Sequence, residues 1–285
     1  MMTIRAWPTS AMLAAELLKV RKRWMPYGLL LPLVAMLALQ TFAAYFAGWR
    51  GDRDLDALRT AVLPWSLPSL LDLIQYFGAI LLAILAASAV GTEHGWGTVR
   101  QALIRGQTRS QYLTTKLLGI AVVGAIGFLL AFGIGLGFSA IVTALEAPDL
   151  PGGPSTTDVL LMILRAGYGI VPYALLAFCL AVVGRSTTLG VAGGLMYVFV
   201  EGIVLAILGG IGGAAADARG FFIGHNVSAL LEVNRIGSVD YVSFALRDPT
   251  PTGLPDPAIA ALVLALYCIG FLTISFVIFR RRDVQ

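Results

Sequence analysis

The sequence is poor in charged residues, in histidine and in cysteine. Charged residues make up 13% of the 285 positions, against about a quarter in soluble domains. Cys179 and Cys268 both lie within hydrophobic runs, so they indicate neither a disulfide framework nor a metal site. His94 and His225 are isolated, and the sequence holds no His-Glu-x-x-His or Gly-x-Ser-x-Gly pattern. The sequence therefore predicts no catalytic residue and no metal ligand.

Lysine is confined to Lys19, Lys22 and Lys116, and none of these follows a glycine-rich loop. A Walker-type ATPase needs such a lysine to hold the nucleotide phosphates. We therefore expect that the chain is not an enzyme and binds no cofactor. The sequence also lacks a basic stripe with interleaved aromatic residues, which excludes nucleic acid as an expected partner.

Long apolar runs are what the sequence does contain. Hydrophobic residues make up 58% of the chain, and they cluster into runs of roughly 20 or more, the length needed to cross a hydrocarbon core of about 30 Å. We predict an all-α polytopic membrane protein with six transmembrane helices. The spans are expected at residues 27–48, 70–91, 113–143, 159–183, 187–209 and 258–280.

Positive charge is distributed unevenly over the segments that connect these spans. Most basic residues fall at the two termini and in the loops on the same side, namely Arg5, Lys19, Arg21, Lys22, Arg23, Arg100, Arg105, Arg109, Lys116, Arg185, Arg280, Arg281 and Arg282. Fewer lie opposite, together with most of the acidic residues. The positive-inside rule then places both termini in the cytoplasm. We expect a protein of the cytoplasmic membrane of a prokaryote.

An amphipathic helix is predicted ahead of the first span, at residues 11–23. The apolar residues of one face recur at helical spacing: Leu13, Leu17, Val20 and Trp24. The opposite face carries Glu16, Lys19 and Arg23. Ser10 is expected to cap this helix, and Pro26 is expected to separate it from the first span. Such a helix lies in the headgroup plane, either as a simple topology anchor or with a more specific role.

Residues 92–112, between the second and third spans, combine polar anchors, glycines and two helix-start signals. Thr98 and Thr108 are each followed three residues later by a glutamine, a pattern that forms a capping box. Gly106 supplies a left-handed stop between the two boxes. A polar helix of under two turns on the membrane surface has the form of a docking site for a partner.

Two charged residues lie inside predicted spans, Arg165 in the fourth and Glu201 in the fifth. Each costs roughly 2.5–3.5 kcal/mol near the bilayer centre, so each suggests a function. We expect Arg165 to extend to the outer interface, with pairing to Glu201 or contact with substrate as alternatives. Glu201 is expected to line the transport path or its gate, together with Arg165, Tyr168 and Pro172. Pro172 is also expected to kink the fourth span.

The segment 210–257 is long for a loop, and loops of this length are usually functional or disordered. Asn226 is expected to cap a short apolar stretch that ends near Val233. We predict short helices that fold back over the outer mouth, with a flexible loop as the alternative. The residues expected to be shielded from water there, as an external gate, are Phe221, Phe222 and Leu230.

Glycines four residues apart occur within the spans, as in Gly133 with Gly137 and Gly190 with Gly194. Small residues at this spacing let helix backbones approach closely in lipid. Packing within one subunit is the simpler explanation, and a contact between two subunits is the alternative.

The pattern Glu93-x-x-x-Gly97-Thr98-x-Arg100, followed by Arg105-Gly106-x-x-Arg109 and Lys116, resembles the cytoplasmic coupling segment of type-2 ATP-binding-cassette (ABC) exporter permeases. The N-terminal helix resembles the elbow helix of that family, and the Arg280-Arg-Arg-Asp283 ending is also similar to it. The resemblance implies an elbow helix at 1–26 and a six-span permease domain at 27–285. That domain would contain a coupling segment at 92–112 and a helical external segment at 210–257.

The resemblance implies the transmembrane subunit of an exporter for a lipophilic or amphipathic substrate, in the drug, peptide or lipid class. A separate ATPase subunit would bind ATP and Mg. The other implied partners are membrane lipid and a second permease subunit, which we expect to be a second copy of this chain, so that the permease is a homodimer. Glu93 would hold the coupling segment by bonding backbone N–H groups or a nearby arginine. Arg100, Arg105 and Arg109 would contact the ATPase or only lipid phosphates. The alternative is a six-helix secondary transporter or another transport protein without ATP coupling.

Overall fold

The computed structural model describes residues 9–48, 55–104, 106–146, 154–234 and 253–281, and over these residues the chain is helical with no β-strand. Six helices are long and apolar enough to cross a membrane: α2 (Met25–Gly48), α4 (Leu67–Gly95), α6 (Arg109–Glu146), α7 (Thr156–Gly184), α8 (Thr187–Ile211) and α11 (Pro257–Arg281). Each of them overlaps one predicted span. The prediction of an all-α protein with six hydrophobic helices is therefore confirmed.

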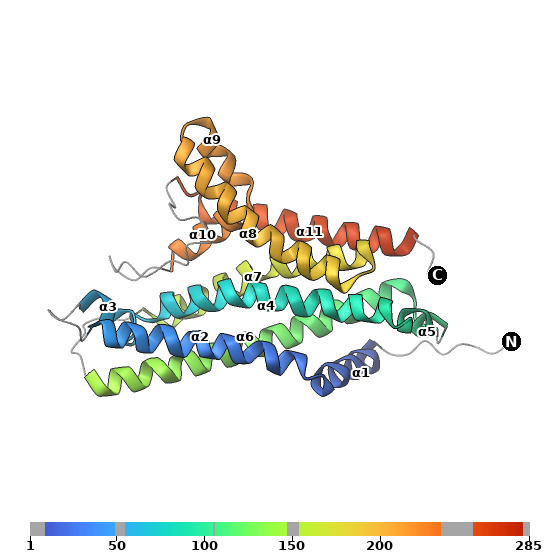
Figure 1. Ribbon diagram of the computed structural model, residues 1–285, viewed down its shortest axis with the longest axis horizontal. Coiled ribbons are helices and arrows are strands. Elements are labelled where there is room, and N and C mark those ends of the chain that lie inside the picture. Colours follow the sequence, from blue (N-terminus) through green and yellow to red (C-terminus); the bar gives the residue numbers. More distant parts are fainter. Residues whose placement is uncertain (1–8, 49–54, 105, 147–153, 235–252, 282–285) are drawn as a thin grey trace.

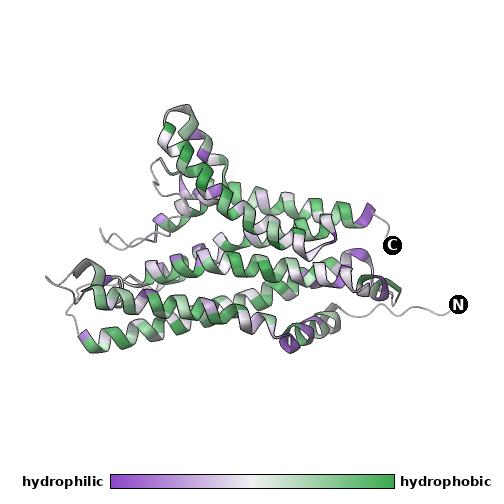
Figure 2. Cartoon of the chain, viewed as in Figure 1, coloured by the Kyte–Doolittle hydropathy of each residue, from purple (hydrophilic) through white to green (hydrophobic). Residues whose placement is uncertain are grey.

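Shorter helices precede and connect the long ones: α1 (Thr9–Lys22), α3 (Leu55–Arg59), α5 (Thr98–Ile104), α9 (Ala214–Asp217), the 3-10 helix η1 (Ala218–Phe221) and α10 (Ile223–Glu232). The helices α1 and α5 and the last turn of α11 lie at one end of the molecule (Figure 1). Hydrophilic residues gather at that end, whereas the long helices are mostly hydrophobic (Figure 2). The second half of α8 leans away from the other helices and carries α9 at its tip (Figure 1).

The helices α4 and α7 form the centre of the bundle. In their most apolar stretches 61% and 67% of the residues are buried, against 17–28% in the other four long helices. Small side chains make close packing between the two helices possible, because they let the backbones approach. These residues form one buried cluster: Ala83, Ala87, Ala177 and Ala181.

The glycine pair Gly190 and Gly194 packs α8 against this centre. A Cβ atom at Gly190 would lie 2.7 Å from the Cβ of Ala181, and one at Gly194 would lie 3.0 Å from a side chain of α7. Packing within one subunit, the simpler explanation, is therefore confirmed for this pair. Gly133 and Gly137 differ, because a Cβ at either position would meet nothing within 4 Å.

The N-terminal helix α1 packs on α6, and Glu16 is buried in this contact beside the predicted apolar residues Leu13, Leu17 and Val20, which are half-buried. It begins at Thr9, so Ser10 lies inside the helix rather than capping it. Glu16, assigned to the polar outer face, is buried, whereas Leu18 is exposed. Gly119 of α6 permits this contact, since a Cβ there would lie 3.0 Å from the Cγ of Glu16. The predicted break before the first span is present, because α1 ends at Lys22 and Pro26 falls in the first turn of α2.

Candidate functional site

The connection from α4 to α6 is short and tightly turned. Gly97 has a φ of +66°, which glycine adopts without strain, and it reverses the chain after the end of α4. Thr98 is the first residue of α5, and its hydroxyl donates to the carbonyl of Glu93 at 3.2 Å. The predicted capping box of Thr98 with Gln101 is therefore wrong. Its hydroxyl instead ties α5 back to the last turns of α4.

The second predicted capping box is present at the start of α6. The N–H of Thr108 donates to the Oε1 of Gln111 at 3.1 Å, and the N–H of Gln111 donates to the Thr108 hydroxyl at 3.2 Å. Gly106 has a φ of +93°, as expected for the left-handed stop after α5. The end of α5 and the beginning of α6 are thus specified locally by the sequence.

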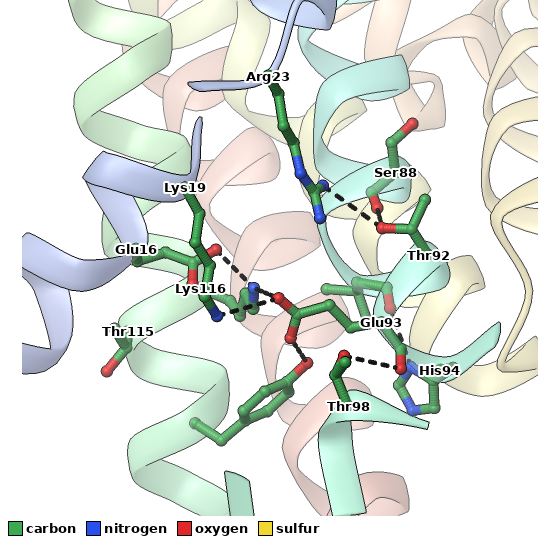
Figure 3. A network of polar contacts seen from close by, with 12 residues as sticks. Glu16, Lys19, Arg23, Ser88, Thr92, Glu93, His94, Thr98, Thr115 and Lys116 are labelled. Carbon is green, nitrogen blue, oxygen red and sulfur yellow. Dashed lines mark hydrogen bonds and ion pairs between the residues drawn. The ribbon is translucent and has the colours of Figure 1, made fainter. Parts of the chain in front are cut away.

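Behind α5, side chains from three helices meet in a group that we call the ionic cluster: Glu16 and Lys19 of α1, Glu93 of α4 and Lys116 of α6 (Figure 3). The Nζ of Lys116 lies 2.5 Å from the Oε1 of Glu16 and 2.5 Å from the Oε1 of Glu93. Lys19 reaches the same two carboxylates at 3.4 and 3.3 Å. The second Glu93 oxygen accepts the Tyr112 hydroxyl at 2.8 Å.

The ionic cluster is buried except for Lys19. The exposed fractions of Lys116, Glu93 and Glu16 are 3%, 4% and 7%, whereas the Lys19 side chain is 55% exposed. Two carboxylates placed this close together would repel each other strongly if no cation lay between them. With two lysines and two glutamates the cluster is neutral, and Lys116 is the cation that both carboxylates share. The ion pairs of Lys116 therefore join α6 to α1 and to α4.

Glu93 lies in the predicted coupling segment, but its partners differ from those expected. Its side chain bonds Lys116, Lys19 and Tyr112 rather than backbone N–H groups or an arginine. The physical reason is that Tyr112 and Lys116 are four residues apart on α6, so both project from the same face toward the end of α4. That spacing was visible in the sequence as a signal for shared contacts.

The short helix α5 is attached by one side and open on the other. Val99 is buried, while Arg100 and Gln101 are exposed and Ile104 is 75% exposed. Arg105 lies outside the residues that the structure describes. The outer face of α5 therefore offers a cation, an amide and an apolar side chain next to one another.

Arg109, predicted to contact a partner or lipid, has partners within the chain. Its Nη1 donates to the backbone carbonyls of Phe279 at 3.3 Å and of Arg280 at 2.9 Å. The last carbonyls of a helix have no intrahelical partner, and a cation there is favourable. Arg109 thus joins the first turn of α6 to the final turn of α11.

Glu201 is buried in a second polar group, away from α5. Its Oε1 accepts the Tyr197 hydroxyl and the backbone N–H of Gly224, each at 2.9 Å, and its Oε2 accepts the Tyr173 hydroxyl at 2.9 Å. These donors come from α8, α10 and α7, so the carboxylate joins three elements. A Cβ at Gly224 would lie 3.1 Å from the Glu201 Oε2, so a larger residue would require the carboxylate to shift by a few tenths of an ångström.

The residues predicted to accompany Glu201 do not converge on it. Arg165 donates from Nη1 to the Oδ1 of Asn234, in the predicted external segment, at 3.1 Å, so it does not pair with Glu201. The Tyr168 hydroxyl donates to the carbonyl of Ala261 at 2.9 Å and joins α7 to α11. Pro172 is buried inside α7, which continues through it as one helix.

Tyr173, Tyr197 and Gly224 are the Glu201 partners that sequence reasoning missed. Tyr197 precedes Glu201 by four residues on α8, and this spacing could have indicated a contact. Gly224 and Tyr173 are brought to Glu201 only by the packing of α10 and α7.

Between Gly210 and Asn234, the external segment contains α9, η1 and α10. Asn226 is the fourth residue of α10 rather than its cap, and its Nδ2 donates to the carbonyls of Gly220 and Phe222 at 2.7 Å each. Leu230 is buried, as predicted, whereas Phe222 is only half-buried. Phe221 is 76% exposed, so the described chain does not shield it, and this part of the prediction is wrong.

Within the residues that the structure describes, no group of three or more His, Cys, Asp or Glu side chains could hold a metal ion. The two polar groups therefore consist of hydrogen bonds and ion pairs between helices. Their geometry fits the transmission of movement and the anchoring of helices, and it offers no nucleophile beside a base.

Comparison with known proteins places the chain in a family. A comparison with curated proteins gives no match. A protein-family model described as "Protein of unknown function (DUF2705)" matches residues 32–285. The matched region begins within α2 and includes both Glu93 and Glu201. Since the match covers well over half of the sequence, the chain belongs to the DUF2705 family.

Proposed function

We propose that this chain is the transmembrane subunit of an ATP-driven exporter, of the kind formed by type-2 ABC permeases. In this proposal α1 is the elbow helix and α5 is the coupling helix, both on the cytoplasmic side of a prokaryotic inner membrane. Two copies of the chain form the permease, and two separate ATPase subunits bind ATP and Mg. The cargo is lipophilic or amphipathic, as in the drug, peptide and lipid classes that such exporters move.

The observation that carries the proposal is the ionic cluster behind α5. A seven-residue helix between two long apolar helices would bend on its own when pushed. Here the hydroxyl of Thr98 fastens α5 to Glu93, and Glu93 is fastened through Lys116 to α6 and to α1. The connection is therefore stiff on its inner side, while Arg100 and Ile104 remain accessible on its outer side.

The mechanism follows from this arrangement. ATP-driven closure of the ATPase subunits presses on the outer face of α5. Because Glu93 and Lys116 join α4 to α6, the displacement moves the two spans together rather than deforming the loop between them. The pairs of Lys116 with Glu16 and of Lys19 with Glu93 carry the same displacement into α1, which leads into the first span.

A secondary transporter is the rival proposal, and Glu201 is the residue that would favour it, because buried carboxylates mark ion pathways. Both oxygens of Glu201, however, already accept hydrogen bonds from within the chain. This use of the carboxylate supports a structural role, so we prefer the ATP-driven exporter.

The test uses the full chain, co-expressed with a candidate soluble ATPase that carries a phosphate-loop lysine and is sought in the reading frames next to that of this chain. Arg100→Glu reverses a charge on the exposed face of α5 and is expected to weaken ATPase co-purification by about tenfold, equivalent to about 1.4 kcal/mol. Arg281→Glu, an exposed charge reversal at the end of α11, is the matched control and should change it little. If the ATPase co-purified equally with both variants, α5 would not be its docking site. Transport by the chain without any ATPase would support the rival.

A further inference from the structure

An apolar cavity lies between the first and third long helices, close to the ionic cluster. Its volume is about 390 Å³, within the range of about 300–1,000 Å³ found for ligand sites. Its walls come from α2, α4 and α6, and include Leu30, Leu33, Leu81, Gly127 and Phe128. Leucine, phenylalanine and glycine walls of this kind accept a hydrocarbon chain and offer nothing to a polar ligand.

A smaller hollow adjoins this cavity on the side of α1. Its charged lining consists of Glu16, Lys19 and Lys116 of the ionic cluster together with Arg23. The two spaces share wall residues from four helices: Val20, Pro26, Leu85 and Val123. Together they form one cleft that is polar at the α1 end and apolar beyond it, the arrangement that an amphipathic ligand requires.

The apolar cavity has one positively charged residue, Arg21, in its lining. Among the described residues the Arg21 guanidinium has no hydrogen-bond or ion-pair partner. The Tyr27 hydroxyl, on the same wall, donates to the backbone carbonyl of Arg21 at 3.2 Å and steadies this turn. The ionic cluster is neutral within itself, so the charge of Arg21 remains available to an anion.

The cavity is also reachable from the side of the helix bundle. Ile126 and Leu130, which line it from α6, are 54% and 51% exposed. In a membrane this surface of α6 would face lipid, so the molecules with direct access to the cavity are those dissolved in the bilayer.

We propose that this cleft binds one glycerophospholipid with an anionic headgroup, taken from the leaflet on the side of α1. Its phosphate contacts Arg21, and one acyl chain occupies the cavity between α2, α4 and α6. Basic pockets between membrane helices recognise anionic headgroups in this way. A soluble phosphate has no group that fills the apolar cavity. A zwitterionic lipid carries its own ammonium next to the phosphate, so it gains less from the guanidinium of Arg21 than a lipid with a net negative headgroup does. The binding site is independent of the proposed exporter function.

The test uses the purified full chain in phosphatidylcholine vesicles that contain a minor fraction of phosphatidylglycerol with a diazirine in one acyl chain. After irradiation, the labelled peptides are mapped by mass spectrometry. The expected label falls on the parts of α4 and α6 that line the cavity. Unlabelled phosphatidylglycerol should compete for that label better than unlabelled phosphatidylcholine does.

Matched variants separate this site from ordinary contact with lipid. Gly127→Phe places a ring in the cavity, where a Cβ meets nothing within 4 Å, and should reduce the label there by about tenfold. Gly133→Phe, on the same helix in equally open space but outside the cavity, should leave the label unchanged. Arg21→Gln should remove the preference for phosphatidylglycerol, whereas Lys22→Gln, one residue further along and outside the cavity, should keep it.

Uniform labelling of all the long helices, with no change in Gly127→Phe, would overturn the proposal and identify only surrounding lipid. If Gly127→Phe fails to fold, as judged by size-exclusion chromatography and helical content, Leu81→Trp fills the cavity from the α4 wall and provides the same comparison. The experiment includes no ATPase, so its failure would leave the exporter proposal standing.

Discussion

The Oε1 of Glu201 accepts the backbone N–H of Gly224 at 2.9 Å, so a side chain in the middle of α8 satisfies the beginning of α10. The first N–H groups of a helix lack intrahelical acceptors, and Phe222, at the capping position, supplies no side-chain acceptor. Negative charge at a helix N-terminus is also favourable. Glu201 therefore does for α10 what a capping residue usually does. Just past the other end of α10, Asn234 bonds Arg165 of α7.

This anchoring role predicts a graded series of stabilities. Glu201→Leu leaves three donors without their acceptor, and each buried unsatisfied group costs about 1–3 kcal/mol, so we expect a loss of at least about 3 kcal/mol. Tyr173→Phe removes a single donor and should cost about 1 kcal/mol. Glu201→Gln keeps one acceptor oxygen and should fall between the two. The measurement is thermal unfolding of the detergent-solubilised chain.

The same variants separate anchoring from a role in transport. If Glu201→Gln unfolds like the wild type but no longer supports transport, the charge itself serves the path, and the anchoring explanation is insufficient. If stability and transport fall together in Glu201→Leu and Tyr173→Phe, the carboxylate acts by holding α10.

The ionic cluster yields a second prediction, in which two lysines receive the same substitution. Lys116→Met removes the buried cation that Glu16 and Glu93 share, and breaking a buried pair costs about 3–5 kcal/mol. Lys19→Met removes a cation whose side chain is 55% exposed and should cost at most about 1 kcal/mol. Thermal unfolding measures both losses, and limited proteolysis reports release of α1. Similar small losses for both variants would show that the cluster does not fasten the three helices.

The positions of the long helices could be predicted because the signal is local. About twenty apolar residues in a row are sufficient to indicate a span, whatever the rest of the chain does. The capping box at Thr108 and the left-handed Gly106 were equally local, and both are present. These features depend on residues no more than a few positions apart.

The partners of the buried charges could not be predicted in the same way. Glu16 was assigned to an outer face because α1 was judged by its own pattern, but Lys116, which buries Glu16, follows 100 positions later. Pairing with Arg165 was the alternative that the charges suggest for Glu201, yet its donors are two tyrosine hydroxyls and a backbone N–H. Periodicity shows which residues share a face, and it carries no information on the element that covers that face.

A third prediction concerns the closest approach between α4 and α8. A Cβ at Gly91 would lie 2.3 Å from the backbone nitrogen of Thr187, and backbone atoms cannot move aside as the end of a flexible side chain can. Gly91→Ala should therefore destabilise the chain by about 1–3 kcal/mol or more through overpacking. Gly95→Ala lies one turn further along α4, where a Cβ meets nothing within 4 Å. It should be neutral or stabilising by up to about 1 kcal/mol, because alanine favours the helix.

The control makes the Gly91 comparison specific. Both substitutions replace glycine by alanine on the same helix, so they share any general effect of the exchange. A Gly91→Ala chain as stable as Gly95→Ala would mean that α4 and α8 lie further apart than the structure shows.

The last prediction concerns the orientation of the helices in the membrane, which follows from the charge at the end where α1 and α5 lie. Gln101 of α5 and Asp256 are both exposed, and Asp256 directly precedes α11, whose opposite end lies on the side of α1 and α5 (Figure 1). Each can be replaced by cysteine in a chain whose Cys179 and Cys268 are changed to alanine. The positive-inside rule places Gln101 in the cytoplasm, because α1, Arg100 and the end of α11 share its end. In intact cells a membrane-impermeant maleimide should label Asp256→Cys rapidly and should label Gln101→Cys only after permeabilisation. The reverse pattern would invert the topology and would remove α5 from the reach of any cytoplasmic ATPase.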